Sequence, residues 1–439
     1  MSSTSSSYLK EFRFQDTVSI ITDFTANGSF ESLRLNVKYY YEENYARLIR
    51  LTDLRKGLKN DGVYVDSAGY EYLKKSSLQE NDLLLANVGE YTGFVCLMPE
   101  LEQHSTLAPN MFLIRFEPFI DSKFMYYLMS GDAFTNAVDC ISASSATKLL
   151  NKTNLRKMVI HFPELPKQQK IASVLSTVDN LIEQNQNLID KYTSVEKGMM
   201  ADLFSRGIDL SGTADTNKNY GQLRPSFDDA PELYQETELG RVPKEWDVEK
   251  LENLTTKIID GTHHTPTYTD RGIPFLRVTD VQTKEINLEK VKFVSEKEHE
   301  QLIKRCNPEV GDILYSKNGT IGIPKIVNWD WDFSVFVSLC LIKPAHEKIN
   351  NQYLGLILTS DVVWTQIRIR AKQGTVTNLH LEEIREFQIP LPNSEEQTEI
   401  VTRSKALQNR IDNEKESLDK YKLIKKGLMQ DLLTGKVTV

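Results

Sequence analysis

Two stretches of the chain carry apolar residues in alternating steps of four and three positions. The first lies within residues 165–206 and the second within residues 393–439. A stripe of this kind, sustained over about five heptads, is typical of a helix that pairs with another helix in a coiled coil. The apolar positions that we expect to form the helix–helix contact are Ile171, Leu175, Val178, Ile182, Ile189, Tyr192, Met199 and Leu203 in the first stretch and Ile400, Leu407, Ile411, Leu418, Tyr421, Leu428 and Leu432 in the second.

Both stretches have the sequence signals of helix ends. Pro166 and Pro392 precede the expected helical starts, where the chain is not yet helical. Gly207 and Gly435 follow the last stripe positions, where a C-terminal cap is expected. A helix of about 38 residues is roughly 57 Å long at 1.5 Å per residue. The pattern therefore predicts two long helices.

The two stretches are copies of each other. Adding 229 to each number in 163–204 places that segment on 392–433 without a gap. Identical residues occur at Pro163/Pro392, Gln168/Gln397, Ile171/Ile400, Asn180/Asn409, Ile182/Ile411 and Met200/Met429, among others. Such self-similarity indicates an internal duplication.

The regions before the two long helices also correspond, although fewer side chains are identical. Short runs typical of β-strands recur as 48–53 and 275–280 (LIRLTD, FLRVTD), as 82–85 and 312–315 (DLLL, DILY), and as 111–114 and 337–340 (MFLI, VSLC). An amphipathic helical pattern recurs as 124–132 and 353–361. The sequence thus predicts an α+β fold in which one mixed α/β domain occurs twice. We expect a first domain at 1–164, a long helix at 165–206, an acidic linker or irregular crossing segment at 207–239, a second domain at 240–392 and a second long helix at 393–439.

Composition and charge narrow the class of protein. The 439 residues, 40% hydrophobic and 26% charged, are typical of a soluble protein with two or three domains. The net charge is −8, of which seven acidic and two basic residues between positions 207 and 240 supply −5. The chain has no run of eighteen apolar residues, and its Ser-rich start lacks the apolar core of a secretory signal. Four scattered cysteines, never in C-x-x-C spacing, indicate free thiols, so we expect a cytoplasmic protein without membrane contact.

Catalytic motifs are missing from the sequence. It has neither a phosphate-binding G-x-x-x-x-G-K-[ST] loop, nor a G-x-G-x-x-G fingerprint, nor a G-x-S-x-G nucleophile elbow. No Pro-Pro dipeptide occurs, so the amino-methyltransferase motif is absent as well. His263 and His264 form the only histidine pair, and no Cys or carboxylate stands at metal-ligand spacing from them. We therefore expect a non-catalytic chain without a metal or cofactor of its own.

Polar loops follow several of the predicted strands in both halves. Arg, Lys, Asn, Gln and Thr are the side chains that read base edges and hold phosphates in nucleic-acid complexes, although Gly, Asn and Thr also build ordinary turns. The candidate DNA contacts are Arg50, Asn87, Tyr91, Ser144, Ser145 and Lys148 in the first half and His263, His264, Thr265, Arg277, Lys317, Asn318, Gln373, Thr375 and Thr377 in the second.

Several segments resemble one known family in combination. They are 165–172 (LPKQQKIA) and 392–400 (PNSEEQTEI) at the helix starts, 197–203 (KGMMADL) and 426–436 (KGLMQDLLTGK) at the helix ends, and 240–246 (GRVPKEW), 260–266 (DGTHHTP) and 272–276 (GIPFL) in the second domain. Together they resemble the specificity subunits of type I restriction–modification enzymes. The first domain departs from that pattern, because residues 8–24 lack the Pro-x-x-Trp entry.

The resemblance implies a fold and a mechanism. It implies two target-recognition domains joined by two long antiparallel helices, with each domain reading one half of an interrupted site in double-stranded DNA. It further implies two methyltransferase subunits that use S-adenosylmethionine to methylate adenine, and restriction subunits that use ATP for translocation and cleavage. These cofactors would belong to the partners, while this chain would only recognise DNA.

Two alternatives remain from the residues alone. The acidic charge favours a coiled-coil adaptor whose two globular domains bind proteins, because DNA binding depends on neutralising phosphates. An enzyme in its own right is a second alternative, and the missing catalytic motifs count against it. A loop-lined basic face on both domains would favour DNA recognition over the adaptor.

Overall fold

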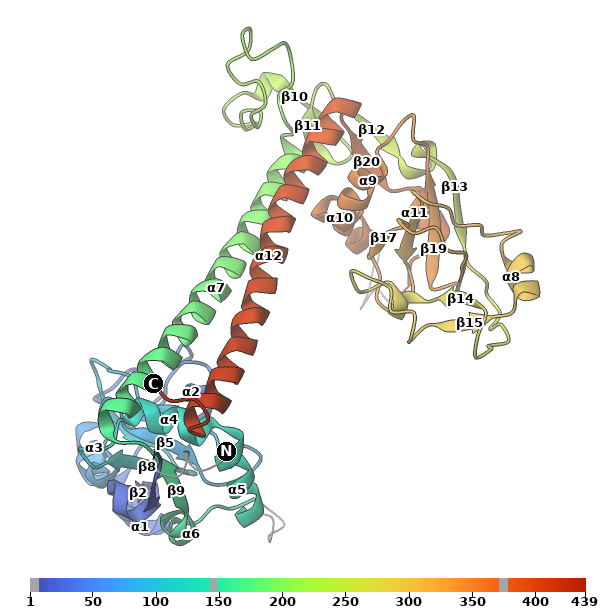
Figure 1. Cartoon of the computed structure of the whole chain (residues 1–439). Coiled ribbons are helices and arrows are strands. Elements are labelled where there is room, and N and C mark those ends of the chain that lie inside the picture. Colours follow the sequence, from blue (N-terminus) through green and yellow to red (C-terminus); the bar gives the residue numbers. More distant parts are fainter. Residues whose placement is uncertain (1–7, 143–147, 371–377) are drawn as a thin grey trace. The chain divides into compact units, whose positions relative to one another are not determined.

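The computed structural model describes residues 8–142, 148–370 and 378–439 (Figure 1). The chain divides into two compact units, Met1–Asn187 with Lys415–Val439 and Leu188–Glu414. Each unit therefore contains one globular domain and a part of each long helix. Within the described ranges, none of the helices combines the length and apolar character that crossing a membrane needs.

The first unit contains the expected mixture of short strands and short helices. Its strands are β1 (Lys10–Arg13), β2 (Val18–Asp23), β3 (Ala46–Ile49), β4 (Tyr64–Val65), β5 (Leu83–Ala86), β6 (Val95–Leu97), β7 (His104–Leu107), β8 (Met111–Phe116) and β9 (Val159–Phe162). Its shorter α-helices are α1 (Phe30–Asn36), α2 (Leu51–Arg55), α3 (Ser67–Tyr72), α4 (Ser122–Ser130), α5 (Asp132–Ser142) and α6 (Lys152–Lys157).

A four-stranded antiparallel sheet, in the order β2-β8-β5-β6, separates two cores in this unit. Successive side chains of a strand point to opposite faces. Leu83 and Leu85 of β5 accordingly join a core with α4 and the long helices, while Leu84 joins a core with the smaller sheet β4-β3-β7. Strand β5 is an unbroken apolar run because both of its faces are buried. Strand β1 pairs separately with β9.

The second unit repeats this architecture. Its strands are β10 (Tyr234–Thr237), β11 (Gly240–Pro243), β12 (Asp247–Lys250), β13 (Thr255–Asp260), β14 (Ile273–Leu276), β15 (Lys292–Val294), β16 (Ile313–Ser316), β17 (Pro324–Ile326), β18 (Ser334–Val335), β19 (Leu339–Pro344) and β20 (Gln388–Leu391). Its shorter α-helices are α8 (Glu296–Leu302), α9 (Asn351–Thr359), α10 (Asp361–Arg370) and α11 (Leu381–Arg385).

The sheet topology confirms the duplicated α+β fold. The order β13-β19-β16-β17 matches β2-β8-β5-β6, the order β15-β14-β18 matches β4-β3-β7, and β12 pairs with β20 as β1 pairs with β9. In both smaller sheets the first strand in sequence, β3 or β14, has one antiparallel and one parallel neighbour. The same connectivity in the two units shows that one scaffold has been used twice.

One expected correspondence differs by two residues. The sequence comparison equated Ile114 with Cys340, but in the structure Ile114 pairs with Leu83, whereas Ile342 pairs with the equivalent Ile313. Ile114 therefore corresponds to Ile342. A slip of two residues keeps every side chain on its own face, so an apolar pattern of period two does not exclude it.

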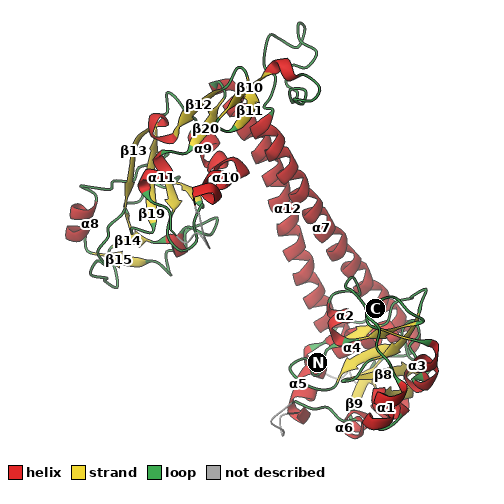
Figure 2. Cartoon of the chain, turned by 180° about the vertical axis from the view of Figure 1, so that it is seen from behind, coloured by secondary structure: helices red, strands yellow, loops and turns green. Residues whose placement is uncertain are grey.

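The two long helices are α7 (Leu165–Ser205) and α12 (Ser394–Leu433), which run side by side in Figures 1 and 2. Every apolar stripe position named above is buried or half-buried. Ser404 is also buried, at a stripe position where the apolar pattern is interrupted. Gly207 and Gly435 have φ angles of 64° and 71°, as a left-handed C-terminal cap requires. Helix α7 begins one residue before Pro166, so that proline lies in the first turn, where proline is favoured.

Within each unit the helices pair in opposite directions. In the first unit, Ile171 near the start of α7 shares one core with Leu432 at the end of α12. In the second unit, Leu203 near the end of α7 shares one core with Ile400 at the start of α12. The stripe thus buries each helix against both the other helix and a globular domain.

Buried glutamines anchor each long helix to its own domain. Gln168 accepts a hydrogen bond from the Asp121 amide over 2.9 Å, and Gln397 accepts one from the Asn350 amide over 2.8 Å. Each also donates to the carbonyl of the proline five residues before it, over 2.9 Å. A buried side-chain amide needs hydrogen-bond partners for both its oxygen and its nitrogen. These matching contacts explain why glutamine occupies both positions.

The segment at 207–239 is irregular over much of its length, yet it is packed against the second unit. Ile208 and Arg224 are buried, and β10 pairs with β11, joining Tyr234 to Pro243. A domain boundary at residue 240 would therefore divide this hairpin. The sequence pattern did not predict the packing, because the partner of Arg224 is Glu396, 172 residues away.

Candidate nucleic-acid interface

Several predicted contact residues of the first unit meet at one end of its large sheet. Strands β2 and β5 end at Asp23 and Ala86, and both pair there with the start of β8. Asn87 follows β5 directly, and the amide of Gly89 donates to the carbonyl of Lys148 over 3.0 Å. The structure therefore brings Asn87 and Lys148 together. We call this end of the sheet the first reading end.

The equivalent end of the second unit has the same construction. Strands β13 and β16 end at Asp260 and Ser316, and both lie beside the start of β19. Lys317 follows β16, and its carbonyl accepts a hydrogen bond from the Leu379 amide over 2.8 Å. The chain around 378 is thus held against the loop after β16. We call this end the second reading end.

Arg50 and Arg277 form a matched pair in the two units. Each follows the first strand of the smaller sheet and is joined to an aspartate three residues later, with Arg50 Nη2 2.6 Å from Asp53 Oδ1 and Arg277 Nε 3.1 Å from Asp280 Oδ2. Burial by itself would raise the pKa of Asp53, but hydrogen bonds from Arg50 and Asn60 hold that pKa below its ordinary value. The arginine side chains remain 35% and 31% exposed. Each guanidinium is therefore fixed in direction and still accessible.

The ring of Tyr91 is in contact with Arg55, a residue that the sequence pattern did not identify as part of this surface. The guanidinium of Arg55, at the end of α2, lies 3.9 Å from the centre of the Tyr91 ring. Arg55 is exposed, so the pair gives the first reading end a basic and aromatic surface of the kind that holds phosphates and bases. Lys148 is also exposed, and its ammonium lies 2.7 Å from Asp139. Arg55 and Tyr91 are distant in the sequence, and only the fold brings the end of α2 beside this loop. A local sequence pattern therefore could not identify the pair.

His263, His264 and Thr265 are exposed directly after β13. His263 Nε2 lies 3.2 Å from Asp260 Oδ2, and His264 Nδ1 lies 2.8 Å from Thr262 Oγ1. Both imidazoles are thus oriented by neighbours while their surfaces face solvent. Exposed and oriented side chains of this kind suit contact with DNA. That contact stays a prediction for His263, His264 and Thr265.

Gly261 fixes where this loop leaves the sheet. A Cβ atom at Gly261 would lie 2.2 Å from the carbonyl oxygen of Val335, so no other residue fits without a backbone shift. The same carbonyl accepts a hydrogen bond from the Thr262 amide over 3.0 Å. The backbone at Gly261 and Thr262 thus lies against Val335 of β18, and this contact holds the loop with His263 and His264 beside the smaller sheet.

Lys317 is less accessible than the other predicted contacts of the second unit that the structure describes. Its side chain is buried, and its ammonium lies 3.3 Å from Asp260 Oδ1. An ammonium buried beside a carboxylate is held by that pairing, so Lys317 supports the loop at Asp260, and its contact with DNA stays a prediction. Asn318 beside it is half-buried, and its backbone bridges to Asn378.

Five predicted contacts lie outside the described residues and stay predictions. They are Ser144, Ser145, Gln373, Thr375 and Thr377. The described chain on their flanks reaches the two reading ends, through Lys148 in the first unit and through the backbone bridge of Asn378 in the second.

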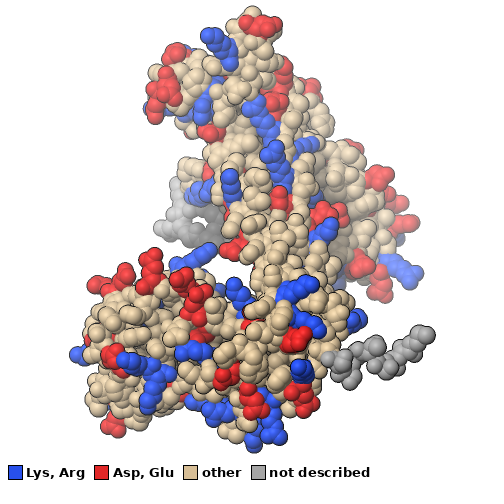
Figure 3. Space-filling view, turned by 60° about the vertical axis from the view of Figure 1, so that its left-hand side comes forward, with Lys and Arg blue, Asp and Glu red and all other residues tan. Residues whose placement is uncertain are grey.

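Charges of both signs occur on the face of the molecule drawn in Figure 3. Lys and Arg side chains there are mixed with Asp and Glu side chains. The acidic crossing segment packs beside the start of α12 and Trp246. Much of the net negative charge of the chain therefore belongs to this segment.

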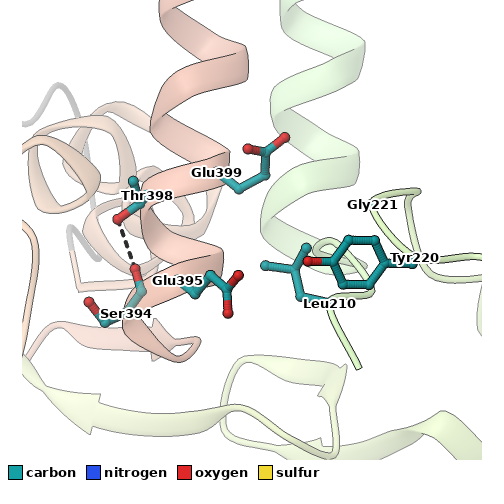
Figure 4. Close-up of a pocket in the computed structure, with 7 residues that line it drawn as sticks. All are labelled: Leu210, Tyr220, Gly221, Ser394, Glu395, Thr398 and Glu399. Carbon is teal, nitrogen blue, oxygen red and sulfur yellow. Dashed lines mark hydrogen bonds between the residues drawn. The ribbon is translucent and has the colours of Figure 1, made fainter. Parts of the chain in front are cut away.

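The crossing segment and the start of α12 line an open cavity of about 620 Å³ (Figure 4). Glu395 and Glu399 line one side, and Leu210 and Tyr220 face them from the crossing segment. Arg403 Nε lies 2.8 Å from Glu399 and neutralises that carboxylate. In the part of the chain that the structure describes, no group of three His, Cys, Asp or Glu side chains is placed to hold a metal ion. The acidic lining distinguishes this cavity from the reading ends.

Two copies of one α+β module, each with polar loops at an equivalent sheet end, define a class of proteins that carry two equivalent surfaces in one chain. Residues 35–192 and 243–422 both match the family described as "Type I restriction modification DNA specificity domain". These segments cover most of the chain, so the chain belongs to this family.

Individual proteins agree with that assignment. Two relatives come from Methanocaldococcus jannaschii. The "Type I restriction enzyme MjaVIII specificity subunit" is 23% identical, over 90% of this chain and 87% of its own length, and the "Putative type I restriction enzyme MjaX specificity subunit" is 27% identical, over 86% and 83%. The crystal structure of a type I restriction–modification S subunit from M. genitalium has a TM-score of 0.55 at 16% identity, covering 97% of this chain and 96% of its own, and shows the same fold.

Proposed function

We propose that this chain is the DNA-recognition subunit of a type I restriction–modification complex and that each of its units reads one half of an interrupted target. The proposal rests on one observation, which is that both units have a reading end of the same construction. A family of DNA specificity domains occurs twice in one chain, with Arg50 and Arg277 at matching positions. Because the side chains around these arginines differ between the units, the two halves of the target differ in sequence.

The partners follow from the same proposal. Two methyltransferase subunits bind the chain, since its internal repeat offers two similar surfaces to identical partners. They supply S-adenosylmethionine and flip the target adenine, while this chain holds the duplex. Restriction subunits supply ATP-driven cleavage. The names of the relatives support a shared enzyme complex, because each is called a specificity subunit.

Methylome sequencing tests this function. A host that expresses this chain with its methyltransferase subunit is compared with a host that expresses the methyltransferase alone. We expect methyladenine in a motif of two short halves with a fixed gap, and loss of that motif without this chain. Unchanged methylation, with the complex verified in the cell, would reject DNA recognition and favour the protein-binding adaptor.

A further inference from the structure

A basic loop follows α2 in the first unit and contacts the first reading end. Arg55, Lys56 and Lys59 are exposed there. Within the ranges that the structure describes, none of the three is paired with a carboxylate. Exposed cations without a partner in their own chain are available to an anion from outside, and phosphate oxygens are strong acceptors for them. We call residues 55–59 the basic loop.

The strand before α2 holds the basic loop in one conformation. Arg47 of β3 donates hydrogen bonds to the carbonyl of Leu58 over 3.2 Å and to that of Asn60 over 3.0 Å. Leu58 has a φ angle of 61°, a left-handed conformation that is uncommon for a residue with a side chain. The two bonds thus fix a shape that a free chain rarely adopts, so the cations are positioned before any ligand binds. Pro274 occupies the place of Arg47 in β14, so the second unit has no counterpart of this guanidinium.

Both ends of the basic loop are joined to the groups that we propose to read bases. At its start, Arg55 lies over the ring of Tyr91, and the loop of Tyr91 is bonded to the backbone of Lys148. Just after its end, the carbonyl of Asp61 accepts a hydrogen bond from Arg50 Nη2 over 3.1 Å. The loop cations therefore lie beside the first reading end, where a duplex read by Arg50 carries its phosphates.

The equivalent segment of the second unit lacks this excess of positive charge. Residues 54–61 contain three cations and one carboxylate, whereas residues 281–290 contain two cations and two carboxylates. Lys284, one of those two cations, is paired with Asp412 at 2.7 Å. The basic loop is thus a feature of the first unit and does not belong to the duplicated scaffold.

We propose that the basic loop binds the phosphate backbone beside the half of the target that the first unit reads, and that it makes this unit the salt-sensitive anchor of the chain on DNA. This inference rests on the proposed function, because it takes the duplex from there. Each cation that neutralises a phosphate releases a counterion, so the loop adds affinity for DNA of any sequence. Arg50 beside it reads sequence, since phosphate contacts position a protein and base contacts give specificity.

The basic loop also reconciles DNA recognition with the net charge of −8. Seven acidic and two basic residues between positions 207 and 240 supply −5 of that charge, and they belong to the second unit. In the first unit, three exposed cations lie within residues 55–59. Attraction to DNA depends on such a local concentration of charge and not on the total.

A double variant, Lys56→Gln with Lys59→Gln, tests the basic loop. Glutamine removes the charge and keeps a polar side chain, and Arg55 is left in place because it contacts Tyr91. Binding of the full chain to its target duplex is measured by fluorescence anisotropy over a series of salt concentrations. The slope of log affinity against log salt should become shallower by about 1.8, at about 0.9 for each phosphate contact. The wild-type advantage in affinity should therefore shrink about tenfold between about 50 and 200 mM salt.

The matched control is Lys284→Gln with Lys290→Gln in the equivalent segment of the second unit. It removes the same number of charges and should leave the slope unchanged. For the loop variant, the ratio of affinities for the target and for an altered duplex should stay at the wild-type value, whereas Arg50→Ala should lower that ratio. All these lysines are exposed, so the melting temperatures of both double variants should stay near that of the wild type.

Four results would overturn the inference. A loop variant with the wild-type slope and affinity, while the wild type binds its target, would place the phosphate contacts elsewhere and leave the proposed function intact. An equal change of slope in the control variant would mean that both units hold the backbone alike. A lower ratio of target to altered duplex in the loop variant would make the loop a reader of bases. If the wild type bound no duplex at any salt concentration, the proposed function itself would fail.

Discussion

Arg224 and Glu396 form a buried ion pair, with Arg224 Nη2 3.0 Å from Glu396 Oε2. The same carboxylate accepts hydrogen bonds from Trp246 Nε1 over 3.0 Å and from the Ile208 amide over 2.6 Å. Burial by itself would lower the pKa of Arg224, but its bonds to Glu396 and Glu245 raise that pKa above its ordinary value. One carboxylate therefore joins the crossing segment, the residue before β12 and the start of α12.

Replacing Glu396 with alanine should destabilise the second unit by about 3–5 kcal/mol, because it leaves the Arg224 charge buried without its main partner. All four tryptophans of the chain lie in residues 246–364, so tryptophan fluorescence during urea unfolding reports on this unit alone. Glu395→Ala, at the exposed neighbouring position, is the control and should change stability by about 0.5 kcal/mol or less. Equal effects of the two substitutions would mean that the ion pair contributes nothing beyond ordinary surface charge.

Arg277→Ala should weaken DNA binding at one half of the target, and Arg50→Ala should weaken it at the other. Loss of a specific arginine contact costs about 1–3 kcal/mol of binding free energy. Binding is measured with the full site and with sites altered in one half, and the melting temperature of each variant shows that it is folded. If each substitution lowered affinity for both halves equally, the assignment of one arginine to each half would be wrong.

Lys317→Ala should act on folding more than on DNA contact. Removing the ammonium takes a buried partner away from Asp260, and breaking a buried pair costs about 3–5 kcal/mol. Urea unfolding followed by tryptophan fluorescence measures this loss. A stable Lys317→Ala chain with weaker DNA binding would instead support Lys317 as a direct contact.

The pKa of Asp53 makes the stability of the first unit depend on pH. Because this pKa is lower in the folded chain, the stabilisation is fully present above the ordinary carboxyl value of 3.8 and is lost as pH falls through the folded value. Asp53→Asn should cost about 1–3 kcal/mol at neutral pH, the value of hydrogen bonds to a charged group, and less under acid. Hydrogen exchange of the α2 amides measures the difference. If the difference in stability between the wild type and Asp53→Asn stayed constant from pH 7 to pH 3, the charge of Asp53 would be excluded as its cause.

The sequence predicted the fold well where a pattern was local. The offset of 229 and the four–three stripe located both long helices, and they correctly implied two similar domains. The correspondence of Arg50 with Arg277 was also visible in the sequence. Each arginine is followed three residues later by its aspartate, Asp53 or Asp280, so the whole motif is local. The entry of the first domain was harder to recognise. Tyr8 contacts Lys167 there, with the ammonium 4.7 Å from the ring centre, where the second domain uses Trp246 and Glu396.

The sequence by itself determined the duplication, the long helices and the family, because periodicity and repeated motifs are properties of neighbouring residues. Only the tertiary structure decided which side chains are available to a partner. It buried Lys317 beside Asp260, placed Arg55 on Tyr91 and joined Arg224 to Glu396. Each of these pairs is far apart in sequence, and burial and ion pairing depend on distances that only the folded chain sets.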